Sequence, residues 1–262
     1  MKELLGLGSK TVIGMVHCLP LPGTAGFENN MEKIFSQAIK DAKTLEAAGC
    51  DALIIENMGD GPFNDFLDIE QTVALTAVST LVKEAVNIPI GIDAAFNDYK
   101  SSLSIAKAIG AAFVRIPVFV DTVMYYNGVL NPCSRDAVLF RRKIHAEKVK
   151  ILADIQVKHT YMVNPTITIQ DSAKMAVSCF ADGIIVTGRS IGTETPIDMI
   201  KQVKAVVNIP VIAGSGVNAN NIKEQLNIAD GAIIGSSLKE GGKISNPISL
   251  ELTKKVLKGL EE

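Results

Sequence analysis

The sequence contains no tryptophan, four tyrosines and three histidines. Its 26 basic and 28 acidic residues give a formal net charge of −2 at pH 7, and no basic run carries interleaved aromatic residues. Proteins that bind nucleic acids or anionic lipid surfaces use a basic patch to attract the phosphate groups. We therefore expect neither kind of partner.

Cysteine and long apolar runs are also scarce. The cysteines at positions 18, 50, 133 and 179 form no Cys-x-x-Cys pair, so we expect reduced thiols and no zinc or iron–sulfur ligand set. No apolar run approaches the ~20 residues that span a bilayer. The N-terminal segment MKELLGLGSKTVIGMVH lacks the apolar core and cleavage site of a signal peptide. These absences predict a cytoplasmic protein without a membrane span.

The chain does contain short apolar runs that alternate with amphipathic segments. Continuous apolar character is typical of strands buried on both faces. The expected strands are 12–17, 52–57, 90–93, 113–117, 151–157, 183–187, 211–213 and 232–234. The expected helices are 29–48, 70–86, 101–109, 135–147, 169–178, 197–207, 219–226 and 247–260.

Internal repeats support this alternation. VKEAVNIPIGID (82–93) returns as VKAVVNIPVIAG (203–214), and AGCDALIIEN, CFADGIIVTG and NIADGAIIGS each place a small residue and an aspartate before a strand. The chain has 262 residues, near the roughly 250 of a typical (β/α)₈ barrel. No Gly-x-Gly-x-x-Gly motif follows the first strand. We predict an α/β fold, a single (β/α)₈ TIM barrel over residues 1–262.

The expected loops differ in length at the two ends of the barrel. The helix-to-strand connections 87–89 and 208–210 are short. The strand-to-helix connections are long: 18–28, 58–69, 118–134, 158–168 and 188–196. Because strand-to-helix loops form the functional face of such barrels, we expect the site at the C-terminal ends of the strands.

The last two strands each end in glycine followed by serine. Glycine lets backbone N–H groups approach an anion, and barrels commonly bind phosphate between these two loops. A helix expected from Ala219 would add the positive end of its dipole. The alternative is that the glycines form tight turns and the serines cap the following helices. We predict phosphate binding at Gly214, Ser215, Gly216, Gly235 and Ser236.

Charged residues near the strand ends suggest proton transfer. Glu56 closes the second strand, and the fifth strand carries Asp154 and ends near Lys158. Four residues along a straight strand span roughly 13 Å, so Asp154 and Lys158 can touch only if the strand ends earlier. We predict that these three catalytic candidates face one cavity. Lys158 is either an anion-binding cation or, if desolvated, a Schiff-base nucleophile.

Arg115 lies inside the fourth strand, where a guanidinium needs a carboxylate partner, and we expect Glu56 or Asp93. Arg115 would serve either this ion pair or the substrate. His17 and His159 could join Glu56 and Asp154 at a metal, but all four come from different segments, so no metal is predicted.

The phenylalanines and tyrosines show no stacking cluster, and no outer helix shows an apolar stripe beyond its core face. Tyr125 and Tyr126 would cover the barrel mouth or anchor their loop.

Seven motifs distributed over the whole chain are specific as a set: GMVHCLPLPG (14–23), LIIENMGDGPF (53–63), Asn97-Asp98, ILADIQVKH (151–159), IIVTG (184–188), AGSGV (213–217) and ADGAIIGSSLK (229–239). In these motifs the sequence resembles the BtpA family, which includes SgcQ-type members, from end to end.

This resemblance implies a barrel whose cyanobacterial relatives are tied to photosystem I accumulation and whose bacterial relatives are grouped with carbohydrate metabolism, without a settled reaction. It also marks Asn97 as a site residue. In the family the strand-three end reads Gly-Ile-Asn, then an apolar residue and an Arg before Asn-Asp, whereas Asp93 and Phe96 stand here.

We therefore expect an enzyme that acts on a small phosphorylated metabolite, resembling a sugar phosphate or a nucleotide, by isomerase, lyase or hydrolase chemistry without a cofactor. One alternative is a non-catalytic assembly or stability factor, as the photosystem link implies. Another is an FMN-binding barrel, because the FMN phosphate could occupy the same glycine-rich cradle. The fold permits all three. A homo-oligomer is compatible with the sequence.

Overall fold

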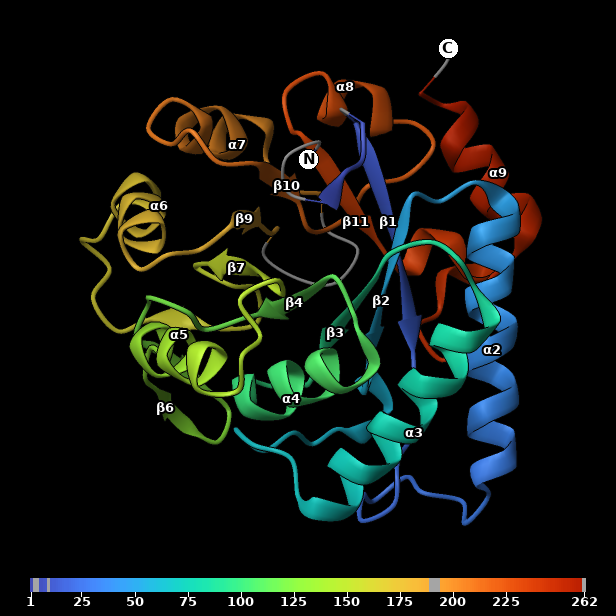
Figure 1. The fold of residues 1–262 in the computed structure, drawn as a ribbon. Helices are drawn as coiled ribbons and strands as arrows, with labels where there is room; N and C mark the ends of the chain where they lie inside the picture. The colour runs from blue at the N-terminus through green and yellow to red at the C-terminus, as the bar shows by residue number, and fades with distance from the viewer. Residues whose placement is uncertain (2–4, 9, 189–193, 261–262) are drawn as a thin grey trace.

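A computed structural model describes residues 1, 5–8, 10–188 and 194–260. Eight parallel strands close into a barrel in the order β1-β11-β10-β9-β7-β4-β3-β2 (Figure 1). The predicted TIM barrel is confirmed. The barrel strands are β1 (Thr11–His17), β2 (Ala52–Glu56), β3 (Ile90–Asp93), β4 (Phe113–Ile116), β7 (Lys150–Ile155), β9 (Gly183–Val186), β10 (Val211–Ala213) and β11 (Gly231–Ile234).

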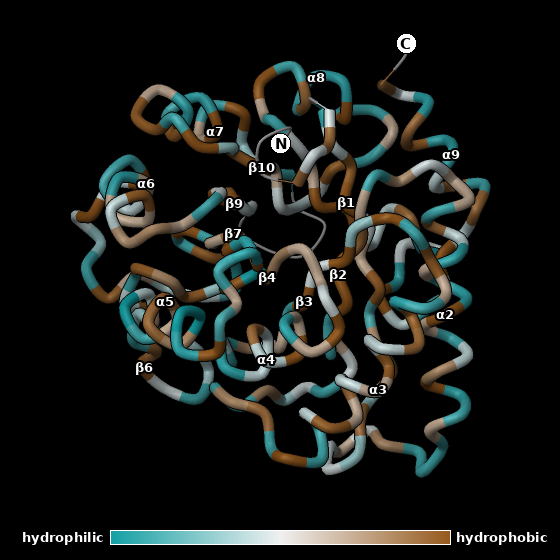
Figure 2. The backbone as a smooth tube through the Cα atoms, in the orientation of Figure 1, coloured by the Kyte–Doolittle hydropathy of each residue, from teal (hydrophilic) through white to brown (hydrophobic). Residues whose placement is uncertain are grey.

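Helices surround the barrel, and their hydrophobic faces pack against the strands. Figure 2 shows hydrophobic residues along β1 and β2 and hydrophilic residues on outward turns of the helices. Every expected helix is present, although several are shorter than predicted. They are α2 (Met31–Ala48), α3 (Ile69–Ala85), α4 (Tyr99–Ile109), α5 (Ser134–Lys143), α6 (Ile169–Ser178), α7 (Ile197–Lys204), α8 (Ile222–Leu226) and α9 (Leu250–Lys258).

Alternation along the strands separates two buried layers, because successive side chains point to opposite faces. One face packs against the helices, and the other fills the barrel interior. Phe113 is a large interior residue, and a Cβ atom on neighbouring Gly91 would lie 2.2 Å from its Cε2 atom. Gly91 therefore makes room for the ring. The interior residues are Ile13, Met15, Ala52, Ile54, Phe113, Leu152, Ile185, Ile212 and Ile233.

The repeated aspartate before a strand has a structural explanation. The side chains of Asp51, Asp182 and Asp230 each accept the backbone N–H of a residue near the start of the neighbouring strand, at 2.7, 2.9 and 2.8 Å. The backbone N–H of each aspartate donates in return to the carbonyl of that residue, at 3.0, 2.9 and 2.8 Å. The repeat thus ties adjacent strands together at the N-terminal end of the barrel.

The strand-to-helix loops contain structure that the sequence analysis missed. A small antiparallel sheet, in the order β6-β5-β8, joins loop 118–134 to loop 158–168. Its strands are β5 (Val123–Tyr125), β6 (Gly128–Leu130) and β8 (Tyr161–Met162). Residues 189–193 of the expected loop 188–196 lie outside the described part of the chain. The described long loops lie at the C-terminal ends of the strands, as expected.

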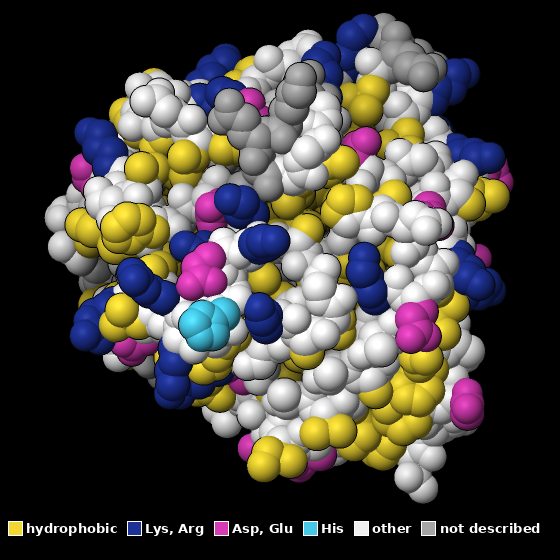
Figure 3. All heavy atoms as spheres, in the orientation of Figure 1, with side chains coloured by type: hydrophobic (Ala, Val, Ile, Leu, Met, Phe, Trp, Pro, Cys, Tyr) yellow, Lys and Arg dark blue, Asp and Glu magenta, His cyan; other side chains and the backbone are white. Residues whose placement is uncertain are grey.

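The outer surface at α3 differs from the sequence expectation. Ile69 and Val73 are 83% and 65% exposed, and Phe66, just before the helix, is 47% exposed. Figure 3 shows hydrophobic side chains gathered at the lower right, where α2 and α3 lie. The expectation that no outer helix carries an exposed apolar stripe is therefore wrong, because α3 is apolar on more than its core-facing side. We call these three residues the α3 stripe.

None of the described helices combines the length and the hydropathy that a membrane span requires.

The aspartate ties predict a specific loss of stability. Asp51→Ala would leave the N–H of Val12 without its side-chain acceptor, which should lower the free energy of unfolding by about 1–3 kcal/mol. Urea denaturation measures the change. Asp198→Ala is the control, because the Asp198 side chain is 86% exposed and its loss should change the free energy by less than about 0.5 kcal/mol. Equal stabilities of the two variants would contradict this account.

Candidate functional site

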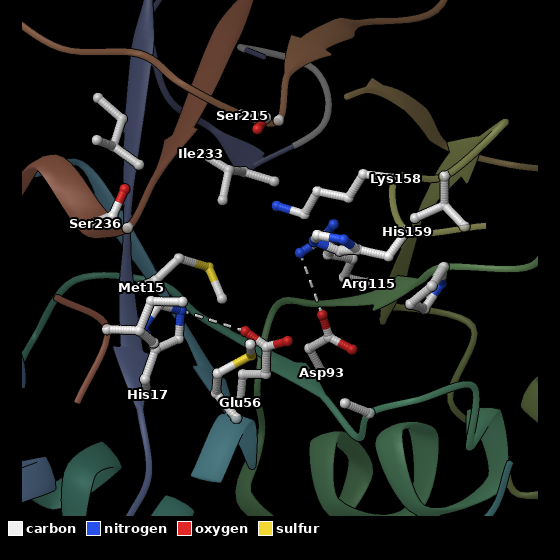
Figure 4. A pocket seen from close by; sticks show the side chains of 18 of the residues that line it. Met15, His17, Glu56, Asp93, Arg115, Lys158, His159, Ser215, Ile233 and Ser236 are labelled. Carbon is white, nitrogen blue, oxygen red and sulfur yellow. Dashed lines mark ion pairs between the residues drawn. The ribbon is translucent and has the colours of Figure 1, made fainter. Parts of the chain in front are cut away.

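A cavity of about 300 Å³ opens at the C-terminal ends of the barrel strands. Its wall combines charged side chains with the two glycine–serine turns, and Figure 4 shows both groups facing the same space. The polar lining consists of His17, Glu56, Asp93, Arg115, Lys158, His159, Ser215, Ser236 and Ser237, and the turn glycines are Gly214, Gly216 and Gly235. The structure therefore brings Glu56, Lys158, Arg115 and all five predicted phosphate-binding residues together.

Strand alternation explains why the charged groups meet. His17, Glu56, Arg115 and Asp154 each lie two positions beyond an interior residue of the same strand, and Asp93 lies two positions beyond Gly91. Side chains two positions apart share a face, so these five form a charged layer directly above the apolar filling of the barrel. Because these side chains are buried above an apolar floor, the interactions among their charges are stronger than in water.

Arg115 and Asp154 form a buried bidentate ion pair. Arg115 Nε donates to Asp154 Oδ1 at 2.9 Å, and Nη2 donates to Oδ2 at 2.8 Å. Asp93 Oδ2 is farther away, 3.5 Å from Nη1. The expectation of Glu56 or Asp93 as the main partner is therefore corrected. The physical reason is register, since β4 and β7 are neighbours that pair Arg115 with Leu152, two residues before Asp154.

The pairing also changes the place of Asp154. Its side chain is 0% exposed, both oxygens accept hydrogen bonds from Arg115, and it is absent from the cavity lining. Asp154 thus lies beneath the wall and not on it, which corrects the expectation that it faces the cavity. Burial opposes the charge of Arg115, but the Asp154 carboxylate raises the pKa of the guanidinium.

Glu56 is paired with His17 across β1 and β2. The two residues are register partners, and His17 Nε2 lies 3.4 Å from Glu56 Oε2. Burial acts to raise the pKa of Glu56, but the hydrogen bond and charge of His17, together with Arg115 and Lys158, bring it below its usual value. Glu56 is therefore an ionised carboxylate at neutral pH, able to accept a proton from a ligand.

Asp93 has the opposite character. It is 1% exposed, lines the cavity, and neither side-chain oxygen has a hydrogen-bond partner among the described residues. Burial and the Glu56 charge raise the pKa of Asp93 well above its usual value, against the opposing effect of Arg115. Two nearby carboxyl groups with pKa values pushed apart are typical of acid–base pairs. The sequence analysis noted Asp93 at its strand end but gave it no catalytic role.

Lys158 reaches the cavity because β7 ends early. The strand stops at Ile155, and Gln156 and His159 have φ angles of 45° and 64°. The strand therefore ends before Lys158, which is the condition under which Lys158 and Asp154 could touch. The Lys158 backbone N–H donates to Thr187 Oγ1 at 3.0 Å, and Figure 4 shows the amine pointing into the cavity. Burial and the charge of Arg115 lower the pKa of Lys158, although three carboxylates oppose them.

The two glycine–serine turns line the opposite side of the cavity. A Cβ atom on Gly214 would lie 2.4 Å from Ile185 Cγ2, and one on Gly235 would lie 3.1 Å from His17 Cε1. Gly216 has a φ of 66°. Packing against Ile185 thus requires Gly214 to lack a side chain whether or not the turn binds phosphate. The helix that was expected from Ala219 is α8, which begins at Ile222 and has five residues. The expectation that its dipole supports the anion site is therefore corrected.

Asn97 has a structural task in addition to any role in binding. Its side chain accepts the N–H of Val118 at 2.8 Å and donates to the Val118 carbonyl at 3.1 Å. Both ends of the amide are therefore used to hold the loop after β4, and Asn97 is absent from the cavity lining.

Three aromatic rings form one wall of the cavity: Phe63, Phe96 and Tyr125. Phe96 and Tyr125 stack with centroids 4.3 Å apart and planes 14° apart, and Phe63 lies 6.5 Å from Phe96. The Tyr126 hydroxyl donates a hydrogen bond to the backbone carbonyl of Phe63. The expectation of no stacking cluster is therefore wrong. We call these three residues the aromatic wall. Because the three residues come from three different loops, the sequence did not indicate the aromatic wall.

Within the described ranges, no three His, Cys, Asp or Glu side chains are placed to hold one metal ion. His17 instead pairs with Glu56. Burial, and to a smaller extent the charge of Lys158, lowers the pKa of His159.

Comparison with known proteins adds a family and a fold class. The model described as the BtpA family matches residues 8–262. An uncharacterised protein of Pyrococcus furiosus is 40% identical over 255 residues, covering 97% of this chain and 95% of the relative. The photosystem I biogenesis protein BtpA of Synechocystis is 34% identical over 242 residues, covering 90% of this chain and 83% of the relative.

Solved structures share the fold at low identity. A tryptophan synthase chain of Mycobacterium tuberculosis superimposes with a TM-score of 0.62 at 15% identity, covering 97% of this chain and 93% of that chain. The N-acetylmannosamine-6-phosphate 2-epimerase of Clostridium perfringens gives a TM-score of 0.54 at 15% identity, covering 89% and 87%. At these identities the likeness establishes the barrel fold alone.

The buried ion pair predicts a large cost for removing one partner. Asp154→Ala should lower the free energy of unfolding by about 3–5 kcal/mol, because Arg115 would keep a buried charge without its main partner. Chemical denaturation of the variant and the parent protein gives the difference. A loss below about 1 kcal/mol would show that Arg115 is satisfied without Asp154.

The raised pKa of Asp93 predicts a pH-dependent stability difference. A carboxyl with a raised pKa in the folded state supports folding fully below the unfolded-state pKa, and this support is lost as pH rises through the folded-state pKa. Asp93→Asn should therefore gain stability relative to the parent protein as pH rises from about 4, by at most about 1.4 kcal/mol per pH unit. Denaturation between pH 4 and 8 measures this gain. A difference that stays constant over this range would contradict the raised pKa.

Proposed function

The chain belongs to the BtpA family, and we propose that it is an enzyme that binds a small phosphorylated metabolite and transfers a proton next to its carbonyl group. The observation that carries the proposal is the composition of one cavity. Glycine–serine turns line one side, and carboxyl and amine groups with shifted pKa values line the other.

The turns would hold the phosphate. The ends of β10 and β11 are neighbours in the barrel, so backbone N–H groups of both turns can converge on one anion. Ser236 adds a hydroxyl group to the same wall. The cavity volume of about 300 Å³ lies at the lower end of the ~300–1,000 Å³ range of ligand pockets. A small metabolite therefore suits the cavity.

The charged layer would carry the reaction. Ionised Glu56 is suited to take a proton from carbon, and protonated Asp93 is suited to donate one to the carbonyl oxygen. The Arg115 guanidinium lines the same cavity and would stabilise the developing oxyanion. Asp154 would act as a positioning residue that fixes Arg115. Isomerases and lyases share this proton-transfer step, so the proposal covers both classes.

The structural neighbours support this reaction class by analogy of fold. These neighbours include an N-(5'-phosphoribosyl)anthranilate isomerase and an N-acetylmannosamine-6-phosphate 2-epimerase, and both enzymes are named after phosphorylated compounds. Such neighbours make phosphate binding a reasonable expectation for this fold. The proposal for this chain rests on the residues of its own cavity, because a shared fold does not establish a function.

A different function is suggested by the Synechocystis relative, which is named a photosystem I biogenesis protein. An assembly factor binds other proteins, and exposed apolar surface is the feature that such binding uses. The α3 stripe is a surface of this kind. It lies on an outer helix and shares no residue with the cavity lining, so the two functions do not exclude each other.

FMN binding is the third function under consideration, and the aromatic wall is the observation that favours it. A flavin ring could lie against Phe63, Phe96 and Tyr125 while its phosphate reached the turns. A purified FMN protein is yellow, so its visible absorbance distinguishes this alternative from the proposed metabolite enzyme.

The phosphate site is testable with inorganic phosphate. Added phosphate should raise the melting temperature of the parent protein, because a ligand that binds only the folded state stabilises it by mass action. Gly235→Val and Gly216→Val should lose this rise, because a side chain at either position narrows the approach to the backbone N–H groups.

Gly235 is the sharper position, since Gly216 has a positive φ that valine tolerates poorly. Calorimetric titration of folded Gly235→Val with phosphate separates lost binding from lost stability. Asn220→Val, at an exposed position beyond the turn, serves as the control. Equal phosphate affinity in Gly235→Val and the parent protein would place the anion elsewhere.

A further inference from the structure

We propose that Lys158 is a covalent catalytic residue whose amine condenses with the carbonyl carbon of the substrate to form a Schiff base. The substrate class is then a phosphorylated aldehyde or ketone. This inference rests on the proposed function and deepens it. It also decides between the anion-binding and nucleophilic interpretations that the sequence left open for Lys158.

The first support is the surroundings of the amine. Lys158 Nζ points into the cavity (Figure 4), and it makes no hydrogen bond or ion pair with any residue that the structure describes. Lys239 offers a contrast within the same chain. That ammonium is 1% exposed, donates to the Asn246 carbonyl at 2.9 Å and lies 3.5 Å from Asp41. A structural buried lysine is thus held by partners here, and Lys158 is not.

The second support is that each nearby carboxyl group is already engaged. Asp154 is bound by Arg115 through both oxygens, and Glu56 is paired with His17. Burial and the charge of Glu56 raise the pKa of Asp93, which favours its protonated form. None of these three carboxyl groups forms an ion pair with the Lys158 amine, although all three oppose the lowering of its pKa. Burial and the neighbouring guanidinium favour the neutral amine, which is the nucleophilic form.

The third support is the fixed backbone around Lys158. Residues in the left-handed region flank it at Gln156 and His159, and non-glycine residues in this region are concentrated at functional sites. The N–H of Gln156 donates to Asp121 Oδ2 at 2.7 Å, and the N–H of Lys158 donates to Thr187 Oγ1 at 3.0 Å. These bonds fix the backbone from which the Lys158 side chain extends into the cavity.

The reaction step balances with groups on the cavity wall. The neutral amine of Lys158 attacks the carbonyl carbon, the C=O electron pair moves to oxygen, and a proton passes from the nitrogen to that oxygen to give a neutral carbinolamine. Asp93 is placed to protonate the leaving hydroxyl, which departs as water while the nitrogen lone pair forms the C=N bond. The resulting iminium is an electron sink, so Glu56 can remove a proton from the adjacent carbon to give the enamine.

Pyridoxal 5′-phosphate is a suitable probe because it carries both an aldehyde and a phosphate group. The full-length protein is incubated with the probe, the Schiff base is reduced with borohydride, and the adduct is located by peptide mass spectrometry. We expect one adduct per chain, on Lys158, and protection by an excess of inorganic phosphate. Because only the neutral amine reacts, labelling should increase with pH. It should reach half its maximum at a pH below the ordinary lysine pKa of 10.5.

Lys158→Arg keeps the positive charge and removes the nucleophile, and Lys243→Arg is the matched control at an exposed position next to the cavity residue Ile244. Lys158→Arg should retain phosphate binding by calorimetry and lose labelling, whereas Lys243→Arg should keep both. Absence of an adduct on Lys158 in a protein that binds phosphate overturns this inference and leaves the proposed function standing. Failure to bind either phosphate or the probe overturns both.

Discussion

The charged layer of this barrel depends on the ion pair between Arg115 and Asp154. Without it, a guanidinium inside a barrel strand would be buried with only Asp93 at 3.5 Å, and unpaired charges in such surroundings destabilise proteins strongly. With it, Asp154 is occupied on both oxygens, so Asp93 and Lys158 receive little compensation for their own burial. The opposite pKa shifts of these two residues follow from that arrangement.

Because the sheet is closed, these charged side chains lie together at one end of the barrel, where they form a candidate active site. Interior side chains change from apolar to polar or charged two positions farther along β1, β2, β4 and β7, and Asp93 joins them from β3. The loops beyond these strands supply the rest of the cavity wall. The glycine–serine turns contribute backbone, while the aromatic wall contributes apolar surface. A ligand that fills the cavity would meet the glycine–serine turns, the charged layer and the aromatic wall. This combination is the basis on which we propose a small phosphorylated carbonyl compound as the substrate.

The sequence predicted features that depend on local pattern. Continuous apolar strands and repeated turns indicated the barrel, and the strand-end positions of Glu56, Lys158 and the glycine–serine turns indicated one face. Features that depend on register or on loop packing were not predictable in this way. The partner of Arg115 follows from the pairing of β4 with β7. The aromatic wall joins three loops. Because α3 carries apolar residues on more than one face, its sequence does not distinguish the exposed Ile69 and Val73 from the residues that pack against the core.

We propose that the glycine–serine turns, and not the basic side chains, hold the phosphate, which leaves Lys158 for chemistry. A crystal structure of the protein with bound phosphate would locate the anion. We expect it between the turns that contain Gly216 and Ser236, with backbone N–H donors at about 2.7–3.2 Å from its oxygens. Phosphate bound instead on the amine of Lys158 and the guanidinium of Arg115 would contradict this proposal.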